Sequence, residues 1–176
     1  VGAARWMVTA TNSEGQTQVF LVDPEQAGVH IDAYGTSDGR QAADIYLEQV
    51  AVGHDALLDG ADCSAALERV LAEGIIAACW EATGAMQAAL EQAQLYTQQR
   101  KQFGQAIASF QVVQHRLAEM AVQCAEAQAA CEFATMRLES QSSNLGQQVA
   151  AGVKNKVGRA ARFIAQECVQ LHGAMG

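Results

Sequence analysis

The sequence predicts an α+β chain in which part of an antiparallel sheet or barrel is followed by three long helices of an up-and-down four-helix bundle. In residues 1–58 short apolar runs alternate with turn residues, whereas from about residue 61 apolar residues recur every three or four positions. Alanine and other small residues crowd the later two thirds of the chain, which favours closely packed helices over a β-sandwich. We therefore expect two domains, residues 1–60 and 61–176.

The first region predicts four strands. Residues 6–10 and 17–22 are rich in β-forming side chains and flank turn residues at 12–15, which indicates a hairpin. Residues 29–34 alternate apolar and polar side chains, and residues 42–52 follow a break at 37–39. Because four strands alone are marginally stable, we expect them to complete a sheet that begins upstream.

The second region predicts helices at about 62–98, 110–138 and 149–171, with a polar turn at 140–146. Asp62 or Ser64 can cap the first helix. Short connections make the three helices antiparallel neighbours, and the fourth helix of a bundle must then come from beyond Gly176 or from another subunit. The expected apolar faces are Leu67, Val70, Leu71, Ile75, Ala78, Ala82, Ala85 and Ala89 in the first helix; Phe110, Val113, Leu117, Met120, Cys124, Ala127, Cys131, Ala134 and Leu138 in the second; and Val149, Val153, Val157, Ala160, Ile164, Cys168 and Leu171 in the third.

Composition argues against several classes of function. A net charge of -8 disfavours nucleic acid and anionic membranes as partners, because both require a basic face. The sequence has no apolar run of about 20 residues that would predict a membrane span. Five scattered cysteines without a Cys-x-x-Cys pair are typical of reduced, buried thiols in a cytosolic protein. The four histidines lie in different predicted elements, so we expect no metal site.

The connection between the first two helices, residues 100–111, carries the clearest candidate site. It combines Arg100 and Lys101 with Phe103 and Gln111. An arginine can bind a phosphate while a neighbouring aromatic ring stacks on a base, so this loop suits a planar phosphate-bearing ligand. The alternative is that Arg100 and Lys101 only complement the dipole at the end of the preceding helix.

The segment at residues 170–176 is a second candidate. Gly173 can simply end the third helix, or it can let a ligand approach backbone N–H groups closely. Each segment alone is a weak signal for a binding site, and two such segments flanking two long helices are a stronger one.

Three motifs in these segments resemble the acyl-CoA dehydrogenases. They read Tyr96-x-x-x-Arg100-Lys-Gln-Phe-Gly-Gln-x-Ile, Phe110-Gln-x-Val-Gln-His-Arg-Leu-Ala-Glu-Met120 and Gln170-Leu-His-Gly-Ala-Met-Gly176. The resemblance covers the whole chain, since the strands are similar to the later part of that family's middle β-domain and the helices to most of its C-terminal bundle.

The resemblance implies an FAD-dependent enzyme that introduces a double bond between the α and β carbons of an acyl-CoA thioester. It also implies a homo-oligomer such as a homotetramer, electron transfer to an electron-transferring flavoprotein, and a role in fatty acid or lipid metabolism such as β-oxidation. The implied location is the cytoplasm, or the mitochondrial matrix in a eukaryote.

By the same resemblance, Arg100, Phe103 and Gln111 contact the adenosine-diphosphate part of FAD, usually that of a neighbouring subunit.

Gln170, Gly173 and Ala174 are expected to meet the same part of the cofactor. The family often has a second glycine where this chain has Ala174.

No catalytic base is assigned. The family's usual glutamate follows the Gln170 motif at a distance that lies beyond Gly176. The first-helix position that some members use falls at Gly74, with Glu73 beside it. A shift of one residue rotates a helical side chain by about 100°, so Glu73 is only a weak candidate.

We therefore expect a fragment of such a dehydrogenase that is catalytically silent by itself. The alternatives are a non-catalytic subunit or oligomerisation module of an acyl-CoA dehydrogenase-like complex, and a helical oligomerisation domain without a ligand. A related oxidase or nitroalkane-type flavoenzyme is also compatible with these motifs.

Overall fold

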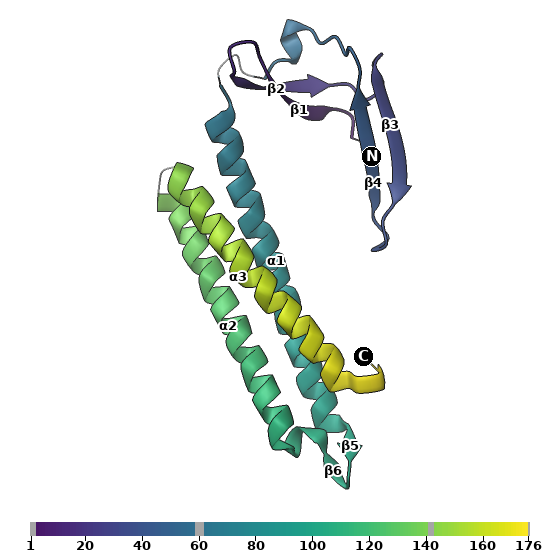
Figure 1. The fold of residues 1–176 in the computed structure, drawn as a ribbon, viewed down its shortest axis with the longest axis vertical. Coiled ribbons are helices and arrows are strands. Elements are labelled where there is room, and N and C mark those ends of the chain that lie inside the picture. Colours follow the sequence, from purple (N-terminus) through teal and green to yellow (C-terminus); the bar gives the residue numbers. More distant parts are fainter. Residues whose placement is uncertain (1–2, 59–61, 141–142, 176) are drawn as a thin grey trace. The chain divides into compact units, whose positions relative to one another are not determined.

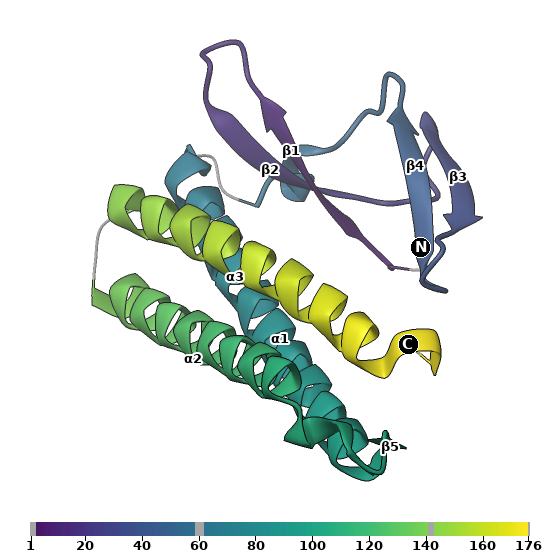
Figure 2. The same ribbon diagram turned by 60° about the horizontal axis from the view of Figure 1, so that its bottom comes forward.

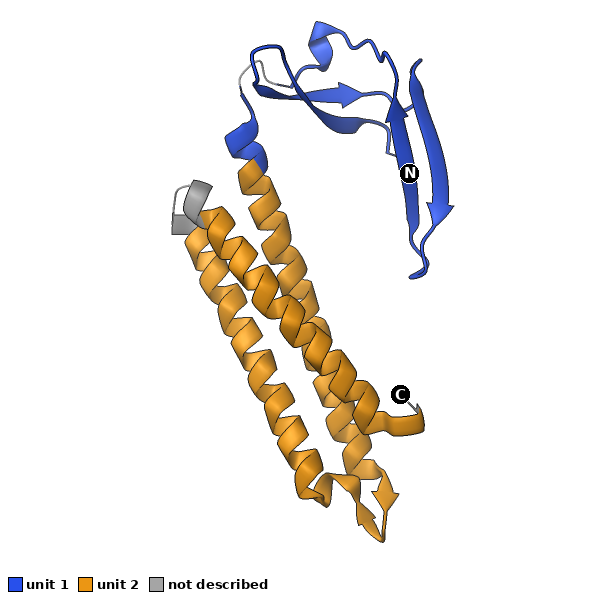
Figure 3. Cartoon of the chain, viewed as in Figure 1, with its two compact units in different colours: residues 1–67 blue, residues 68–176 orange. Residues whose placement is uncertain are grey.

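The structure is a computed structural model that describes residues 3–58, 62–140 and 143–175. The chain divides into two compact units, residues 1–67 and 68–176 (Figure 3). The first unit carries the longer strands, and the second carries most of the first long helix and all of the other two (Figure 1). The predicted domain boundary at residues 60 and 61 lies outside the described residues.

The first unit contains two antiparallel hairpins. Strand β1 (Trp6–Thr11) pairs with β2 (Thr17–Val22), and β3 (Val29–Gly35) pairs with β4 (Gln41–Leu47). The 3-10 helix η1 (His54–Ala56) follows them. The four strands therefore form two separate two-stranded sheets rather than the single sheet or barrel segment that we expected.

The fourth strand is shorter than predicted. It ends at Leu47 rather than at residue 52, and Gln49 has a φ of 53°. This left-handed conformation turns the backbone away from the extended path, so residues 48–52 cannot continue the ladder.

The second unit is built on three long helices. They are α1 (Ser64–Gln99), α2 (Gln111–Ser140) and α3 (Ser143–His172), which run side by side (Figures 1 and 2). Helix α1 begins where predicted, because the Asp62 carboxylate accepts hydrogen bonds from both the backbone N–H and the hydroxyl of Ser64, at 3.1 and 2.7 Å.

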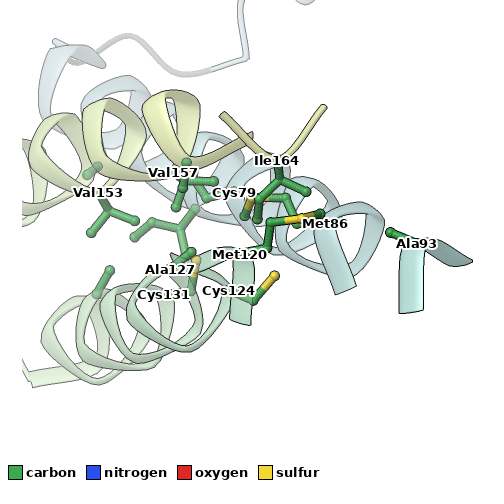
Figure 4. Close-up of a cluster of buried hydrophobic side chains, with 14 of the residues drawn as sticks. Cys79, Met86, Ala93, Met120, Cys124, Ala127, Cys131, Val153, Val157 and Ile164 are labelled. Atoms are coloured by element: carbon green, nitrogen blue, oxygen red, sulfur yellow. The ribbon is translucent and has the colours of Figure 1, made fainter. Parts of the chain in front are cut away.

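The core of this unit fills the space between the three helices. Met120 and Cys131 of α2 are fully buried, and Val157 and Ile164 of α3 are each only 1% exposed (Figure 4). Strong apolar residues at spacings of three and four predicted these faces of α2 and α3, and the structure confirms them. No fourth helix completes a bundle within the described residues.

The buried face of α1 matches the predicted one only in part: Ile75, Ala82 and Ala89 are partly buried and pack against the core, as expected. Val70 and Leu71 were expected in the core, but they are 63% and 66% exposed. Alanines and other small residues of α1 lie on all sides of the helix, so the spacing of its apolar residues fits more than one buried face. Packing against α2 and α3 decides which face is buried. The buried residues of α1 are Ala72, Ile76, Cys79, Thr83, Met86, Ala93 and Thr97.

The predicted turn at residues 140–146 is also wrong in its second half. Residues 141 and 142 lie outside the described residues, but α3 already begins at Ser143. A Cβ atom on Gly146 would lie 3.3 Å from a terminal methyl carbon of Leu138, so this glycine allows α3 to pack closely on α2. Gly146 is therefore a packing residue and not a turn residue.

Candidate functional site

The segment after α1 forms a small hairpin. Strands β5 (Lys101–Gln102) and β6 (Gln105–Ala106) pair antiparallel, and the two residues between them, Phe103 and Gly104, have φ values of 53° and 81°. Positive φ at both central residues is the mark of a type I′ turn. The sequence predicted a loop here; the usual signal for this turn is Asn-Gly or Asp-Gly, and Phe-Gly does not give it.

Backbone hydrogen bonds fix this hairpin to the end of α1. The Arg100 N–H donates to the Tyr96 carbonyl at 2.8 Å, and the Ile107 N–H donates to the Arg100 carbonyl at 2.9 Å. The 3-10 helix η2 (Ile107–Ser109) then leads into α2. Arg100 is therefore held by its backbone while its side chain is exposed.

Phe103 presents its ring to solvent. The residue is 90% exposed, and its ring meets that of Phe110 edge-on, with centroids 6.1 Å apart and an interplanar angle of 86°. A bulky side chain with positive φ is a conformational outlier, and such outliers cluster at functional sites. The hairpin thus holds an aromatic ring outside the core at a cost in backbone energy.

Positive charge at this end of the second unit is not neutralised. Arg100 and Lys101 have no acidic partner among the described residues, whereas arginines elsewhere in the chain, such as Arg69 and Arg116, are paired. No Asp or Glu occurs in residues 92–118. The absence of acidic residues is a sequence signal that composition alone did not reveal, and it favours an anionic ligand over simple dipole compensation.

The other predicted segment lies at the end of α3. Gln170 is exposed on the helix, and Gly173 and Ala174 are exposed in the 3-10 helix η3 (Gly173–Met175). Gly173 has a φ of 61°, and a Cβ atom there would meet nothing within 4 Å. The backbone conformation therefore selects glycine here, while the space beside it stays open to a ligand. Gly176, the last residue of this motif, lies outside the described residues.

One pair of rings brings the two segments together. Tyr96, one turn before Arg100, stacks on His172 with centroids 4.4 Å apart and an interplanar angle of 26°. The Tyr96 hydroxyl also donates to the His172 carbonyl at 3.3 Å. The ends of α1 and α3 and the β5–β6 hairpin consequently share one end of the second unit (Figures 1 and 2). Gln111 is exposed at the first position of α2, beside the same hairpin.

Glu73 lies near the opposite end of α1, about 40 Å from Arg100 at 1.5 Å per residue. It is exposed, and its carboxylate pairs with the Arg69 guanidinium at 2.9 Å. The neighbouring Gly74 lines an apolar groove of about 440 Å³ between α1 and α3, with Lys154 on its α3 side. Glu73 is not among the residues that line this groove.

Two further kinds of site concern the part of the chain that the structure describes, a metal centre and a membrane-spanning helix. It contains no cluster of histidine, cysteine or acidic side chains that could hold a metal ion. It also contains no helix with the length and apolar character needed to cross a membrane.

Comparisons with known proteins identify the second unit. Residues 63–176 match the family described as acyl-CoA dehydrogenase, C-terminal domain. The probable acyl-CoA dehydrogenase FadE25 of Mycobacterium tuberculosis is 29% identical over 99% of this chain and 49% of its own length. The 3-(aryl)acrylate reductase of Clostridium sporogenes is 30% identical over 89% of this chain and 42% of its own. The chain thus spans about half the length of the curated relatives it matches.

Solved structures share the fold. A glutaryl-coenzyme A dehydrogenase superposes with a TM-score of 0.87 over 99% of this chain and 46% of its own, at 24% identity. The ChsE4–ChsE5 complex of Mycobacterium tuberculosis gives 0.82 over 98% and 45%, at 23% identity. At these identities the structures establish the fold alone, whereas the family match covers most of the sequence. The chain belongs to the acyl-CoA dehydrogenase family.

Proposed function

We propose that this chain is the part of an FAD-dependent acyl-CoA dehydrogenase that grips the adenosine-diphosphate half of the cofactor. The carrying observation is that the Tyr96–His172 pair holds the Arg100 hairpin and the Gly173 turn at one end of the helical unit. Family membership supports the redox chemistry, and the exposed groups at that end support the site.

The chemistry of the exposed groups fits the ligand. Arg100 and Lys101 offer positive charge that no acidic side chain in the described part of the chain neutralises, which suits a pyrophosphate. The Phe103 ring stands free of the core and suits stacking on an adenine. Gln111 and Gln170 are exposed amides that can both donate and accept hydrogen bonds.

The Gly173 and Ala174 backbone can approach the ligand closely, because the space beside Gly173 is open. FAD, when bound, supplies the acceptor for the hydride that leaves the β carbon of the substrate. The residues of this chain bind and orient; none of them is assigned to move a proton. The catalytic base and the site of the flavin ring belong to other parts of the protein.

The remaining assignments follow from the family. We infer an acyl-CoA substrate, a homo-oligomer in which this grip reaches the cofactor of a neighbouring subunit, and electron transfer to an electron-transferring flavoprotein. The same inference places the protein in the cytoplasm or mitochondrial matrix, in lipid metabolism such as β-oxidation. The names of similar proteins refer to different substrates, such as 3-(aryl)acrylates and glutaryl-coenzyme A.

A second candidate is a non-catalytic subunit of a two-component dehydrogenase complex. Glu73 is exposed and ion-paired, and the apolar groove beside Gly74 has no carboxylate among its lining residues. The fold match to the ChsE4–ChsE5 complex is compatible with such an assembly. This candidate retains the cofactor grip and lacks the base.

The test is FAD affinity of Arg100→Gln, measured by quenching of flavin fluorescence. Losing a charge-assisted bond should weaken binding by about tenfold to hundredfold. Arg69→Gln is the matched control, because Arg69 lies near the opposite end of α1 and pairs with Glu73. Equal affinity in both variants would remove the proposed site.

Acyl-CoA-dependent reduction of a dye then separates the two candidates. An FAD-loaded protein that turns over is a dehydrogenase, whereas one that binds FAD without turnover is a non-catalytic subunit. Turnover by the 176-residue chain alone would contradict the assignment of the base and the flavin ring to other parts of the protein.

A further inference from the structure

The two proposed binding segments are joined through a single residue of α1. The Tyr96 ring and hydroxyl contact His172, which lies 76 positions later in the sequence. The Tyr96 carbonyl accepts the Arg100 N–H at 2.8 Å. Tyr96 therefore fixes one segment with its side chain and the other with its backbone.

His172 is oriented by a second contact. Its Nδ1 lies 2.8 Å from the Cys168 carbonyl, and because a carbonyl only accepts, Nδ1 carries the hydrogen. The Cys168 carbonyl lies one helical turn earlier in α3, and this hydrogen bond fixes the plane of the imidazole ring. The ring is half-buried and stacks nearly parallel on the Tyr96 ring.

The contact acts directly beside the Gly173 turn. The Tyr96 hydroxyl holds the carbonyl of His172, and the next residue adopts the left-handed conformation that turns the chain out of α3. On the other side, Arg100 is followed at once by the β5–β6 hairpin. The anchored residues Arg100 and His172 thus directly precede the β5–β6 hairpin and the Gly173 turn.

We propose that Tyr96 and His172 are positioning residues that hold the Arg100 hairpin and the Gly173 turn at the separation which lets one adenosine-diphosphate group contact both. This inference rests on the proposed function. Neither side chain needs to touch the ligand, because the contacts act on the backbone of the two segments.

The proposal predicts a specific pattern of variants. Tyr96→Leu and His172→Leu each remove the ring stack, and each should weaken ADP binding by about tenfold. The double variant should be no weaker than either single variant, because both remove the same contact. Tyr96→Phe keeps the ring stack but removes the hydroxyl that holds the His172 carbonyl, so its ADP affinity should lie between those of the wild type and Tyr96→Leu. Leu95→Ala, an exposed neighbour on α1, is the control.

Amide hydrogen exchange of the purified protein without ligand gives an independent measurement. In Tyr96→Leu, exchange should accelerate at residues 173–175, while the buried residues around Val157 should keep their protection. Unchanged exchange at 173–175 would overturn the proposal, whatever the result with ADP.

Binding of ADP and FAD distinguishes a failure of the positioning role from a failure of the proposed function. Wild-type protein that binds ADP together with leucine variants that bind equally well would overturn the positioning role and leave the proposed function intact. Wild-type protein that binds neither ADP nor FAD would overturn the proposed function, and the positioning role would fall with it.

Discussion

Phe103 offers a test in which stability and binding should change in opposite directions. The residue occupies the first central position of a type I′ turn with a φ of 53°, and it is 90% exposed. Replacing it with asparagine creates Asn-Gly, the pair that this turn prefers. Phe103→Asn therefore relieves the backbone while it removes the ring that we propose stacks on the adenine.

The magnitudes follow from the geometry. The left-handed conformation costs an ordinary residue about 1–2 kcal/mol, most of which asparagine avoids. The edge-on contact with Phe110 is worth about 0.5 kcal/mol at so exposed a position. We expect a net stabilisation of about 0.5–1 kcal/mol, which raises the unfolding temperature by about 1–4 °C. Loss of stacking on the base should weaken FAD binding by about tenfold or more.

Thermal unfolding of the protein without FAD and a fluorescence titration with FAD measure the two effects. Phe103→Tyr is the matched control, since it keeps both the ring and the backbone strain and should change neither quantity much. An asparagine variant that unfolds at a lower temperature would refute the reasoning on strain. One that binds FAD as tightly as the wild type would refute the stacking role.

Three further predictions concern other parts of the chain. Gly173→Ala should weaken ADP binding and lower stability by about 1 kcal/mol, because alanine disfavours a φ of 61°; equal stability in chemical denaturation would contradict this. In an FAD-loaded protein that turns over, Glu73→Gln should leave dye-coupled turnover unchanged, since Glu73 is exposed and paired with Arg69; a large loss would restore it as the base. Burial raises the pKa of the Cys79 and Cys124 thiols. As pH rises, both thiols therefore lose their protons in the unfolded chain before they do so in the folded protein. Their contribution to stability should be complete below about pH 8.5 and fall as pH rises above it, which urea unfolding between pH 7 and 10 would measure.

How far the fold could be predicted depended on side-chain size. In α2 and α3, residues such as Met120 and Ile164 contrast with polar neighbours, so the buried faces were evident. In α1, alanines and other small residues allow two faces, and the choice depends on tertiary packing that spacing alone does not contain. The prediction of a turn at Gly146 was wrong for a related reason. In the sequence, a glycine that permits close contact between helices cannot be distinguished from one that ends a helix.

The candidate site was predictable in its residues and not in its geometry. Arg100 and Gly173 were identifiable as candidates, and the family resemblance gave them a common ligand. Their proximity could not be derived, because it depends on a contact between Tyr96 and His172 that are 76 positions apart. The positive φ of Phe103 was equally inaccessible, since phenylalanine is not a residue that signals a type I′ turn.

The central claim is that the Arg100 hairpin and the Gly173 turn bind one adenosine-diphosphate group. Titration of the protein with ADP, followed by amide hydrogen exchange, tests it most directly. We expect saturable binding of ADP with slower amide exchange at both residues 100–107 and residues 170–175. Saturable binding that protects only one segment, or the groove beside Gly74, would contradict it, as would the absence of binding.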